Sequence, residues 1–245
     1  MNYLNKHFET GITHFNTLKA ATDTNITTLE LIESAKQLLK EEKSDADLED
    51  RPNLPLITLH YRAGDDLLNH VLSMITSTEP IDRELGCLIV KEFPSINDAP
   101  TKYSPRIISA IQQMINHGED NMDVLISGLV AVGWQCHANS QTLFDSFIED
   151  KRTEVRQVIA DNLLNLVKDK DSMTPFVIDG FNRLGRDSEA DVRWSIFYDI
   201  SEHFELFEKE KDSFRQLILE GINDTDKAVQ QQAVSAFDKL LKNVC

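Results

Sequence analysis

The sequence predicts an all-α protein, an α-solenoid of about five stacked helix pairs behind an N-terminal helical cap. The main sign is an internal repeat, because Val155, Val192 and Val229 are spaced 37 residues apart. Each valine opens a helical pattern, and another helical pattern precedes each opening. A fixed period of this size is typical of stacked helical arrays. Only 9 Gly and 7 Pro occur in 245 residues, which argues against a many-turned β protein.

The bulk composition gives a large core and a strongly acidic surface. Hydrophobic residues make up 41% of the chain, which is ample for one large domain or an elongated array. The net charge is -16, from 41 acidic and 25 basic residues. The negative electrostatic potential of such a protein disfavours binding to nucleic acids and anionic membranes and favours a basic partner. Solubility is the plainer explanation of the same charge.

The sequence offers no sign of secretion, membrane insertion or metal binding. Cys87, Cys136 and Cys245 form no CxxC pair and no zinc spacing, which fits a reducing compartment. The first residues contain no apolar secretory run, and no window reaches the ~18 apolar residues of a membrane helix. We therefore expect a cytoplasmic protein without cofactor or metal.

Residues 1–50 are predicted to form the N-terminal helical cap and an acidic linker. Residues 1–22 have apolar residues at helical spacing, and a second helix follows, with Thr27 or Thr28 as its N-cap. Residues 41–50 hold six acidic residues and one lysine, which indicates a charged linker or a fraying helix end, with an acidic hook for a basic partner as the alternative. Pro52 and Pro55 are then expected to interrupt helix before the array, residues 51–245.

Five helix pairs are expected within this array. Their first helices span 66–76, 105–117, 140–149, 174–184 and 212–221, and their second helices span 81–93, 122–137, 153–169, 190–203 and 227–243. Short polar turns join the two helices of each pair, so the two should run antiparallel. One pair cannot bury its apolar stripes by itself, and the pairs must therefore stack.

The openings of the second helices resemble the HEAT repeat. Asp191-Val192-Arg193 matches that pattern outright, and Glu154-Val155-Arg156 matches with Glu for Asp. Ala228-Val229-Gln230 departs from it, with glutamine for arginine. Leu59-His60-Tyr61-Arg62 with Glu84-Leu85-Gly86 also looks like the opening of a bacterial HEAT-repeat family of poorly defined role. The resemblance covers roughly residues 56–243.

This resemblance implies a right-handed solenoid whose second helices line the concave surface. It leaves function open, because HEAT-like proteins include scaffolds, inhibitors, phycobilin lyases and a DNA glycosylase. In the register of the third pair, Val155, Ile159, Leu163 and Leu166 should face the core. The face opposite carries, over three successive repeats, Gln157, Asp161 and Asn165, then Trp194, Tyr198 and Glu202, then Gln231, Ser235 and Lys239.

Trp194 and Tyr198 are the candidate binding anchors. They are i,i+4 neighbours at positions that are polar in both adjacent repeats, and aromatic side chains in a groove favour binding. With Asp161, Asp191 and Glu202 beside them, they would suit a basic, partly apolar partner. The alternative is that both rings pack between helices. The same alignment places Trp134 on the groove, although its helix is apolar nearly all round and burial is the alternative there. From the first pair it would place Arg83, Cys87 and Lys91 there.

No catalytic motif is visible, and no catalytic residue is assigned. The chain has no P-loop, GxGxxG, HExxH or GxSxG, and no histidine pairs with cysteine at zinc spacing.

We therefore expect a non-catalytic protein-binding scaffold, most concretely an acidic immunity or inhibitor protein that neutralises a basic partner such as a nuclease toxin. Its oligomeric state is left open. The alternative is a HEAT-fold enzyme. A lyase-like enzyme has no motif to support it, and a glycosylase-like one could use Asp191, Asp199 or Glu202 beside the aromatic pair.

Overall fold

The computed structural model describes residues 25–44, 53–93, 102–167 and 173–241. Every regular element in these ranges is helical, which confirms the all-α prediction. The chain divides into two compact units, Met1–Ala131 and Val132–Cys245. The expected helix over residues 1–22 and most of the expected linker lie outside the described residues.

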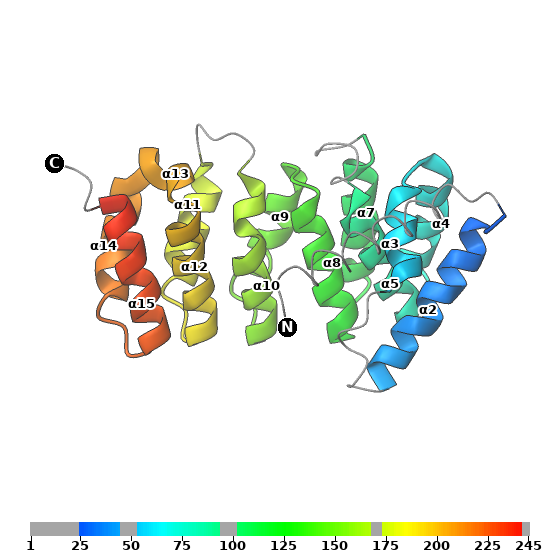
Figure 1. Ribbon diagram of the computed structural model, residues 1–245, viewed down its shortest axis with the longest axis horizontal. Coiled ribbons are helices and arrows are strands. Elements are labelled where there is room, and N and C mark those ends of the chain that lie inside the picture. Colours follow the sequence, from blue (N-terminus) through cyan, green and yellow to red (C-terminus); the bar gives the residue numbers. More distant parts are fainter. Residues whose placement is uncertain (1–24, 45–52, 94–101, 168–172, 242–245) are drawn as a thin grey trace, which may run out of the picture. The chain divides into compact units, whose positions relative to one another are not determined.

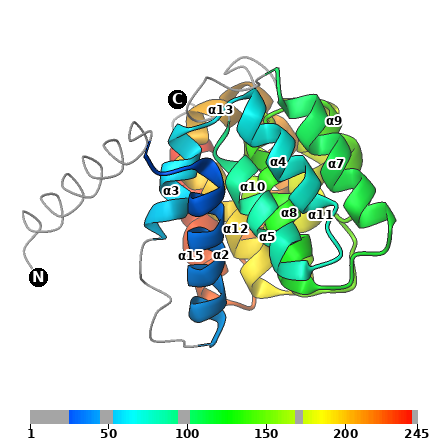
Figure 2. The ribbon, with the colours of Figure 1, turned by 90° about the vertical axis from the view of Figure 1, so that its right-hand side faces the viewer.

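The first unit is a set of helical hairpins. In chain order its helices are α2 (Thr28–Ser44), α3 (Leu54–Tyr61), α4 (Asp65–Ile75), α5 (Pro80–Lys91), α7 (Ser104–Asn116) and the first part of α8 (Met122–Trp134). Helices α2, α3 and α5 pack on one another, and α4 packs on α5 and α7 (Figure 2). The buried side chains come mainly from one face of each helix, such as Leu67, Leu68, Val71 and Ile75 of α4.

The second unit stacks helix pairs in two layers. Its elements are α9 (Asn139–Asp145), α10 (Thr153–Leu163), η2 (Leu164–Leu166), α11 (Pro175–Leu184), α12 (Ala190–Glu202), α13 (Phe204–Phe207), η3 (Glu208–Glu210), α14 (Lys211–Gly221), α15 (Lys227–Ala236) and the π-helical turn η4 (Phe237–Leu241). Helices α10, α12 and α15 lie side by side, and α11 packs on α14 in the other layer (Figure 1).

The start of α2 confirms the expected threonine cap. The Thr27 hydroxyl accepts a hydrogen bond from the Glu30 amide at 3.2 Å, and the Glu30 carboxylate accepts one from the Thr27 amide at 2.7 Å. This reciprocal pair is a capping box, which satisfies two amides that a helix start otherwise leaves without partners. It also holds the pKa of Glu30 below its usual value, through the hydrogen bonds from Thr27.

The structure corrects several of the expected boundaries. The expected interruption at Pro55 is wrong, because Pro55 lies in the first turn of α3, where a missing amide proton does no harm. The helices expected over 140–149 and 122–137 end early, at Asp145 and Trp134. Two short elements, α13 and η3, fill the connection before α14.

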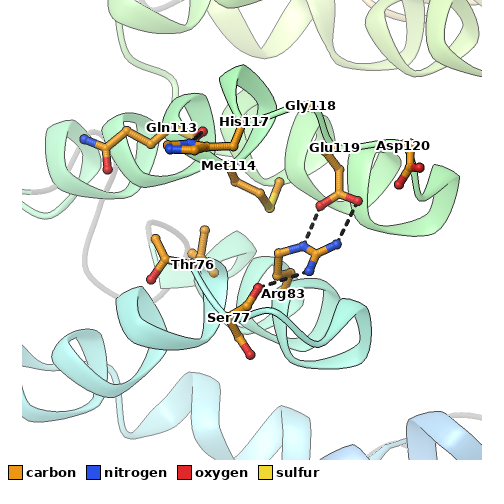
Figure 3. Close-up of a pocket in the computed structure, with 10 residues that line it drawn as sticks. Thr76, Ser77, Arg83, Gln113, Met114, His117, Gly118, Glu119 and Asp120 are labelled. Carbon is orange, nitrogen blue, oxygen red and sulfur yellow. Dashed lines mark hydrogen bonds and ion pairs between the residues drawn. The ribbon is translucent and has the colours of Figure 1, made fainter.

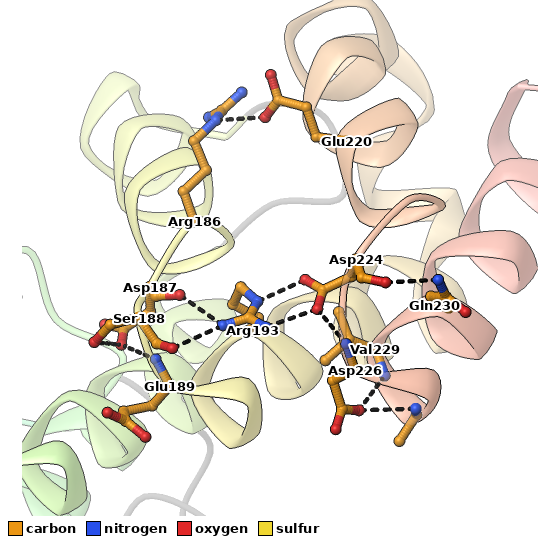
Figure 4. A network of polar contacts seen from close by, with 11 residues as sticks. Arg186, Asp187, Ser188, Glu189, Arg193, Glu220, Asp224, Asp226, Val229 and Gln230 are labelled. Carbon is orange, nitrogen blue, oxygen red and sulfur yellow. Dashed lines mark hydrogen bonds and ion pairs between the residues drawn. The ribbon is translucent and has the colours of Figure 1, made fainter.

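A row of arginine–carboxylate pairs joins successive helix pairs. Arg193 donates from Nε and Nη2 to both carboxylate oxygens of Asp224, at 2.6 and 2.7 Å, and from Nη1 to the Asp187 carbonyl at 2.8 Å (Figure 4). Arg156 repeats this arrangement with the Asp187 carboxylate and the Asp150 carbonyl. In the first unit, Arg83 pairs in the same way with Glu119. Each of these arginines thus binds a carbonyl of the turn before its own helix and a carboxylate of the next turn.

Gln230 stands at the position that Arg156 and Arg193 hold in the two preceding repeats, and it keeps the hydrogen bond to a carbonyl of the turn before its own helix. Its Nε2 donates to the Asp224 carbonyl at 2.6 Å, as Arg193 does to Asp187 one repeat earlier. Within the described residues, no further acidic turn follows α15, so a charged arginine there would gain no carboxylate of this row. The departure of Ala228-Val229-Gln230 from the pattern therefore has a local physical reason.

Gly221 is needed for the close approach of α14 to α12. A methyl group added there would lie 2.8 Å from two ring carbons of Phe197 and closer still to Cζ, and this ring is fully buried. We expect Gly221→Ala to lower the free energy of unfolding by about 1–3 kcal/mol, because overpacking outweighs the gain in helix propensity. Urea unfolding measures this. In the control Gly64→Ala, the nearest atom would lie 3.7 Å away, and the loss should be only about 0.5 kcal/mol, because alanine is a poorer N-cap for α4. Equal effects at both sites would contradict the packing argument.

Candidate functional site

The candidate site is the face of α10, α12 and α15 that turns away from the core. Val155, Ile159 and Leu163 are fully buried and Leu166 nearly so, which confirms the expected core register of the third pair. The positions two residues after the repeated valines therefore point outward. Asp161, Asp191, Glu202 and Gln231 are exposed, and Gln157, Asn165, Ser235 and Lys239 are partly so.

Trp194 and Tyr198 form a stacked pair on this face. Their ring centroids lie 5.0 Å apart, and the ring planes are inclined by only 20°. Tyr198 keeps 40% of its surface exposed, and Trp194 is half-buried. The alternative that both rings pack inside the helix layers does not hold for Tyr198. Stacking also orders the two rings before any partner arrives, which reduces the entropy that binding would have to remove.

A shallow cavity adjoins the stack, where α10 and α12 begin. Its volume is about 470 Å³, and it is lined by Thr153, Glu154, Gln157, Asp191 and Trp194. One wall is therefore aromatic, and two of the lining groups are carboxylates. Thr153 and Glu154 add to the expected site residues, and the sequence signal for them was their place in the repeated opening.

Polar contacts fix the side chains around the aromatic pair. Gln157 donates from Nε2 to the Ser195 hydroxyl at 2.7 Å and to the Asp161 carboxylate at 3.3 Å, which links α10 to α12. Glu202 forms an ion pair with Lys239 at 3.1 Å, which links α12 to α15. The sequence alignment placed Glu202 on this face but did not foresee that Lys239 would partly neutralise it.

Asp199 is the most unusual group near this face. It lies on α12 directly after Tyr198, and its Oδ2 is buried and accepts no hydrogen bond from the described residues. Burial, and secondarily the negative charge of Asp161, raise the pKa of the Asp199 carboxyl to about 7. The equivalent positions one repeat before and after are Asn162 and Ala236, which carry no charge. A carboxylate kept in such a place is a frequent sign of a functional site.

The remaining expected groove residues are placed differently. Trp134 is exposed over 37% of its surface at the end of α8, outside the cavity that Trp194 lines. Cys87 is fully buried, and burial raises the pKa of its thiol above the usual range, so it cannot present a reactive thiolate. Arg83 is held by Glu119. The alignment of the first pair was therefore wrong, because Arg83 is the counterpart of Arg156 and Arg193.

A second cavity, in the first unit, has part of its polar lining already paired. Its volume is about 360 Å³, and it lies beside the Arg83–Glu119 pair, with Thr76, Ser77 and His117 on its walls (Figure 3). Arg83 also donates to the Ser77 carbonyl at 3.0 Å, and His117 lies 2.6 Å from the Gln113 carbonyl through Nδ1. These contacts hold turns together, and Gln113 and Asp120 are further polar residues of the lining.

The described residues contain no group of three or more His, Cys, Asp or Glu side chains that could hold a metal ion. Among the helices that the structure describes, none is long and apolar enough to cross a membrane.

Comparisons with known proteins establish only the fold. No family model matches the chain, and no curated protein matches it. A crystal structure of an engineered protein, determined by the Northeast Structural Genomics Consortium, is similar over 93% of this chain and 96% of that one. The TM-score is 0.52 and the sequence identity 12%, so the likeness concerns the fold and carries no function.

Proposed function

We propose that this chain is a non-catalytic HEAT-like protein that binds a basic protein through the face around Trp194 and Tyr198. In this proposal the helix pairs form a right-handed solenoid of about five HEAT-like repeats with an N-terminal helical cap. The observation that carries the proposal is the exposed aromatic stack among carboxylates. Stacked aromatic rings are favoured interface anchors, and the negative charges around them favour a positively charged partner.

The charges around the stack support a basic partner. Glu154, Asp161, Asp191 and Glu202 lie around it, and Lys239 is already paired with Glu202. Phosphate contacts supply much of the affinity of nucleic-acid-binding proteins, and these carboxylates would repel phosphates. A cytoplasmic immunity or inhibitor protein that covers the basic surface of a nuclease toxin is the most concrete form of this function. Complementary charge would speed its association, and the aromatic anchors would slow release.

The test is the affinity for a partner captured on the purified full chain. Trp194→Ala should weaken binding by about 2 kcal/mol, roughly thirtyfold in Kd, because it removes half of the stack. Glu202→Lys should slow association and reduce its dependence on salt. The matched control is Glu220→Lys, since Glu220 is also an exposed carboxylate in an ion pair, with Arg186, but lies in the other helix layer. Full affinity in both test variants would refute the assignment of this face.

A second candidate function is favoured by Asp199. A raised carboxyl pKa beside aromatic rings would suit a base-excision enzyme of glycosylase type, with Asp199 as the catalytic group. The negative charges around the stack weigh against it. Excision of alkylated bases from DNA by the purified protein, abolished by Asp199→Asn, would establish this alternative over the binding function.

A further inference from the structure

A lysine side chain of the first unit fills a place between two of its helices. Helix α2 packs on α5 (Figure 2), and Lys43 near the end of α2 forms an ion pair with Glu84 of α5 at 3.0 Å and a shorter one with Asp123 of α8. Only 10% of the Glu84 side chain is exposed. Burial raises the pKa of Glu84, and the hydrogen bond from Lys43 opposes this shift. The place between α5 and α8 is therefore a cation site that the chain fills by itself.

The row of arginine–carboxylate pairs identifies the equivalent place in the second unit. In each of two pairs the acid stands three residues before the next helix begins. These pairs are Arg83–Glu119 before α8 and Arg156–Asp187 before α12. The residue directly after each arginine is Glu84 in one unit and Gln157 in the other, and the residue four positions after each acid is Asp123 or Asp191. The place that Lys43 fills therefore corresponds, between α10 and α12, to the space beside Gln157 and Asp191.

That space is the cavity of about 470 Å³ at the start of α10 and α12. Gln157 and Asp191 both line it, together with Glu154. Asp191 and Glu154 are exposed, and neither carboxylate forms an ion pair or accepts a side-chain hydrogen bond within the part of the chain that the structure describes. The arginines that flank Glu154 in the sequence, Arg152 and Arg156, are paired with other carboxylates. The cavity thus presents two carboxylates whose charge no ion pair offsets.

Trp194 adds an aromatic wall to these carboxylates. An ammonium group over the face of a tryptophan ring is attracted by the negative face of its π system, and tryptophan gives the strongest contact of this kind. Stacking on Tyr198, with the ring centroids 5.0 Å apart, holds the Trp194 ring in place. The next gap, between α12 and α15, has Trp194 and Ala228 at the two equivalent positions and so has no carboxylate there. Within the second unit, these features of a cation site meet between α10 and α12.

We propose that this cavity binds the ammonium group of a lysine side chain of the basic partner, held by Asp191, Glu154 and the ring of Trp194. The assignment of the lysine to a partner protein rests on the proposed function. The preference of the cavity for an ammonium group rests instead on its lining and on Lys43, which shows the same kind of contact at the equivalent place in the first unit.

Titration of the full chain with Nα-acetyl-lysine N-methylamide tests the cavity without a partner. This probe should shift the indole N–H signal of Trp194 in NMR spectra, and the norleucine analogue, which has a similar side chain without the charge, should shift it much less. Trp194→Phe assigns the signal. Asp191→Asn should weaken binding of the lysine probe about fivefold, the size expected for one exposed charge pair. The matched control is Glu220→Gln, an exposed carboxylate of the other helix layer, which should leave the titration unchanged.

Two outcomes would overturn the ammonium site while leaving the docking face intact. One is a Trp194 shift of equal size with the lysine and norleucine probes, and the other is a lysine titration that Asp191→Asn does not change. A captured partner gives the second test, because its affinity for Asp191→Asn should also fall about fivefold. If Trp194→Ala weakens the partner and Asp191→Asn does not, the face binds the partner but no lysine enters the cavity, which overturns this inference alone. If both variants keep full affinity, the face is wrong and the inference falls with it.

Discussion

Arg193→Ala should lower the free energy of unfolding by about 3 kcal/mol, because it leaves the Asp224 carboxylate without its cation. Only 13% of the Arg193 side chain and 10% of the Asp224 side chain are exposed, so water would replace the lost contacts poorly. The hydrogen bonds from Arg193 hold the pKa of the Asp224 carboxyl below its usual value, because they stabilise the charged carboxylate. Chemical unfolding at neutral pH measures the loss.

Arg186→Ala is the control for this experiment. Arg186 also joins the same two helix pairs, through an ion pair with Glu220 at 2.6 Å (Figure 4). There, however, 42% and 44% of the two side chains are exposed, and pairs of this kind contribute about 0–1 kcal/mol. If Arg186→Ala were as destabilising as Arg193→Ala, burial would not be what gives the Arg193 pair its importance.

Asp199→Asn should stabilise the protein at pH 8 and leave its stability at pH 4 nearly unchanged. The folded state binds the Asp199 proton more tightly than the unfolded state, because the pKa is raised from 3.8 to about 7. Stability from this group is therefore fully present below pH 4 and is lost as the pH rises toward 7. At about 1.4 kcal/mol per pKa unit the full loss would be roughly 4.5 kcal/mol, and relaxation around the charge should reduce the measured gain to about 2 kcal/mol.

Unfolding free energies at several pH values between 4 and 8 measure this effect. Asparagine should fit the position, because Asn162 occupies the equivalent place on α10 and is buried there. The comparison variant is Asp161→Asn, which removes only the lesser cause of the raised pKa and should give a smaller gain. A gain from Asp199→Asn of the same size at pH 4 and pH 8 would mean that its charge is not the cause.

Much of the helical layout could be predicted from the sequence, and the reasons are local. Helical periodicity and polar turns predict the helices from α4 to α12 and also α14 and α15, and Thr27 followed by Glu30 predicts the start of α2. The sequence does not predict helix α3, because Pro52 and Pro55 indicate an interruption, although a proline in the first turn is compatible with helix. Helix α13 has four residues, too few for a periodic pattern.

The sequence predicts which residues share the face of the candidate site, but it does not predict the contacts between their side chains. The 37-residue alignment placed Trp194 and Tyr198 on one face, but sequence spacing cannot report that their rings stack. The sequence names Asp199 only as one of three carboxylates beside the aromatic pair, because burial of a single oxygen depends on how α10 and α12 meet. A signal was nevertheless available, since the aligned positions hold Asn162 and Ala236. The alignment failed for Arg83, where the first repeats depart from the 37-residue period.

The row of arginine–carboxylate pairs makes residues 187–223 a self-contained module. This block begins with the acid that receives Arg156 and contains Arg193, which reaches the acid opening the next block, Asp224. A tandem copy of the block would therefore recreate each ion pair, because every arginine would again meet an aspartate 31 residues ahead. Each copy would also carry its own Trp194–Tyr198 stack. A tandem duplication of residues 187–223 would therefore lengthen the array and add a copy of the candidate binding face at the same time.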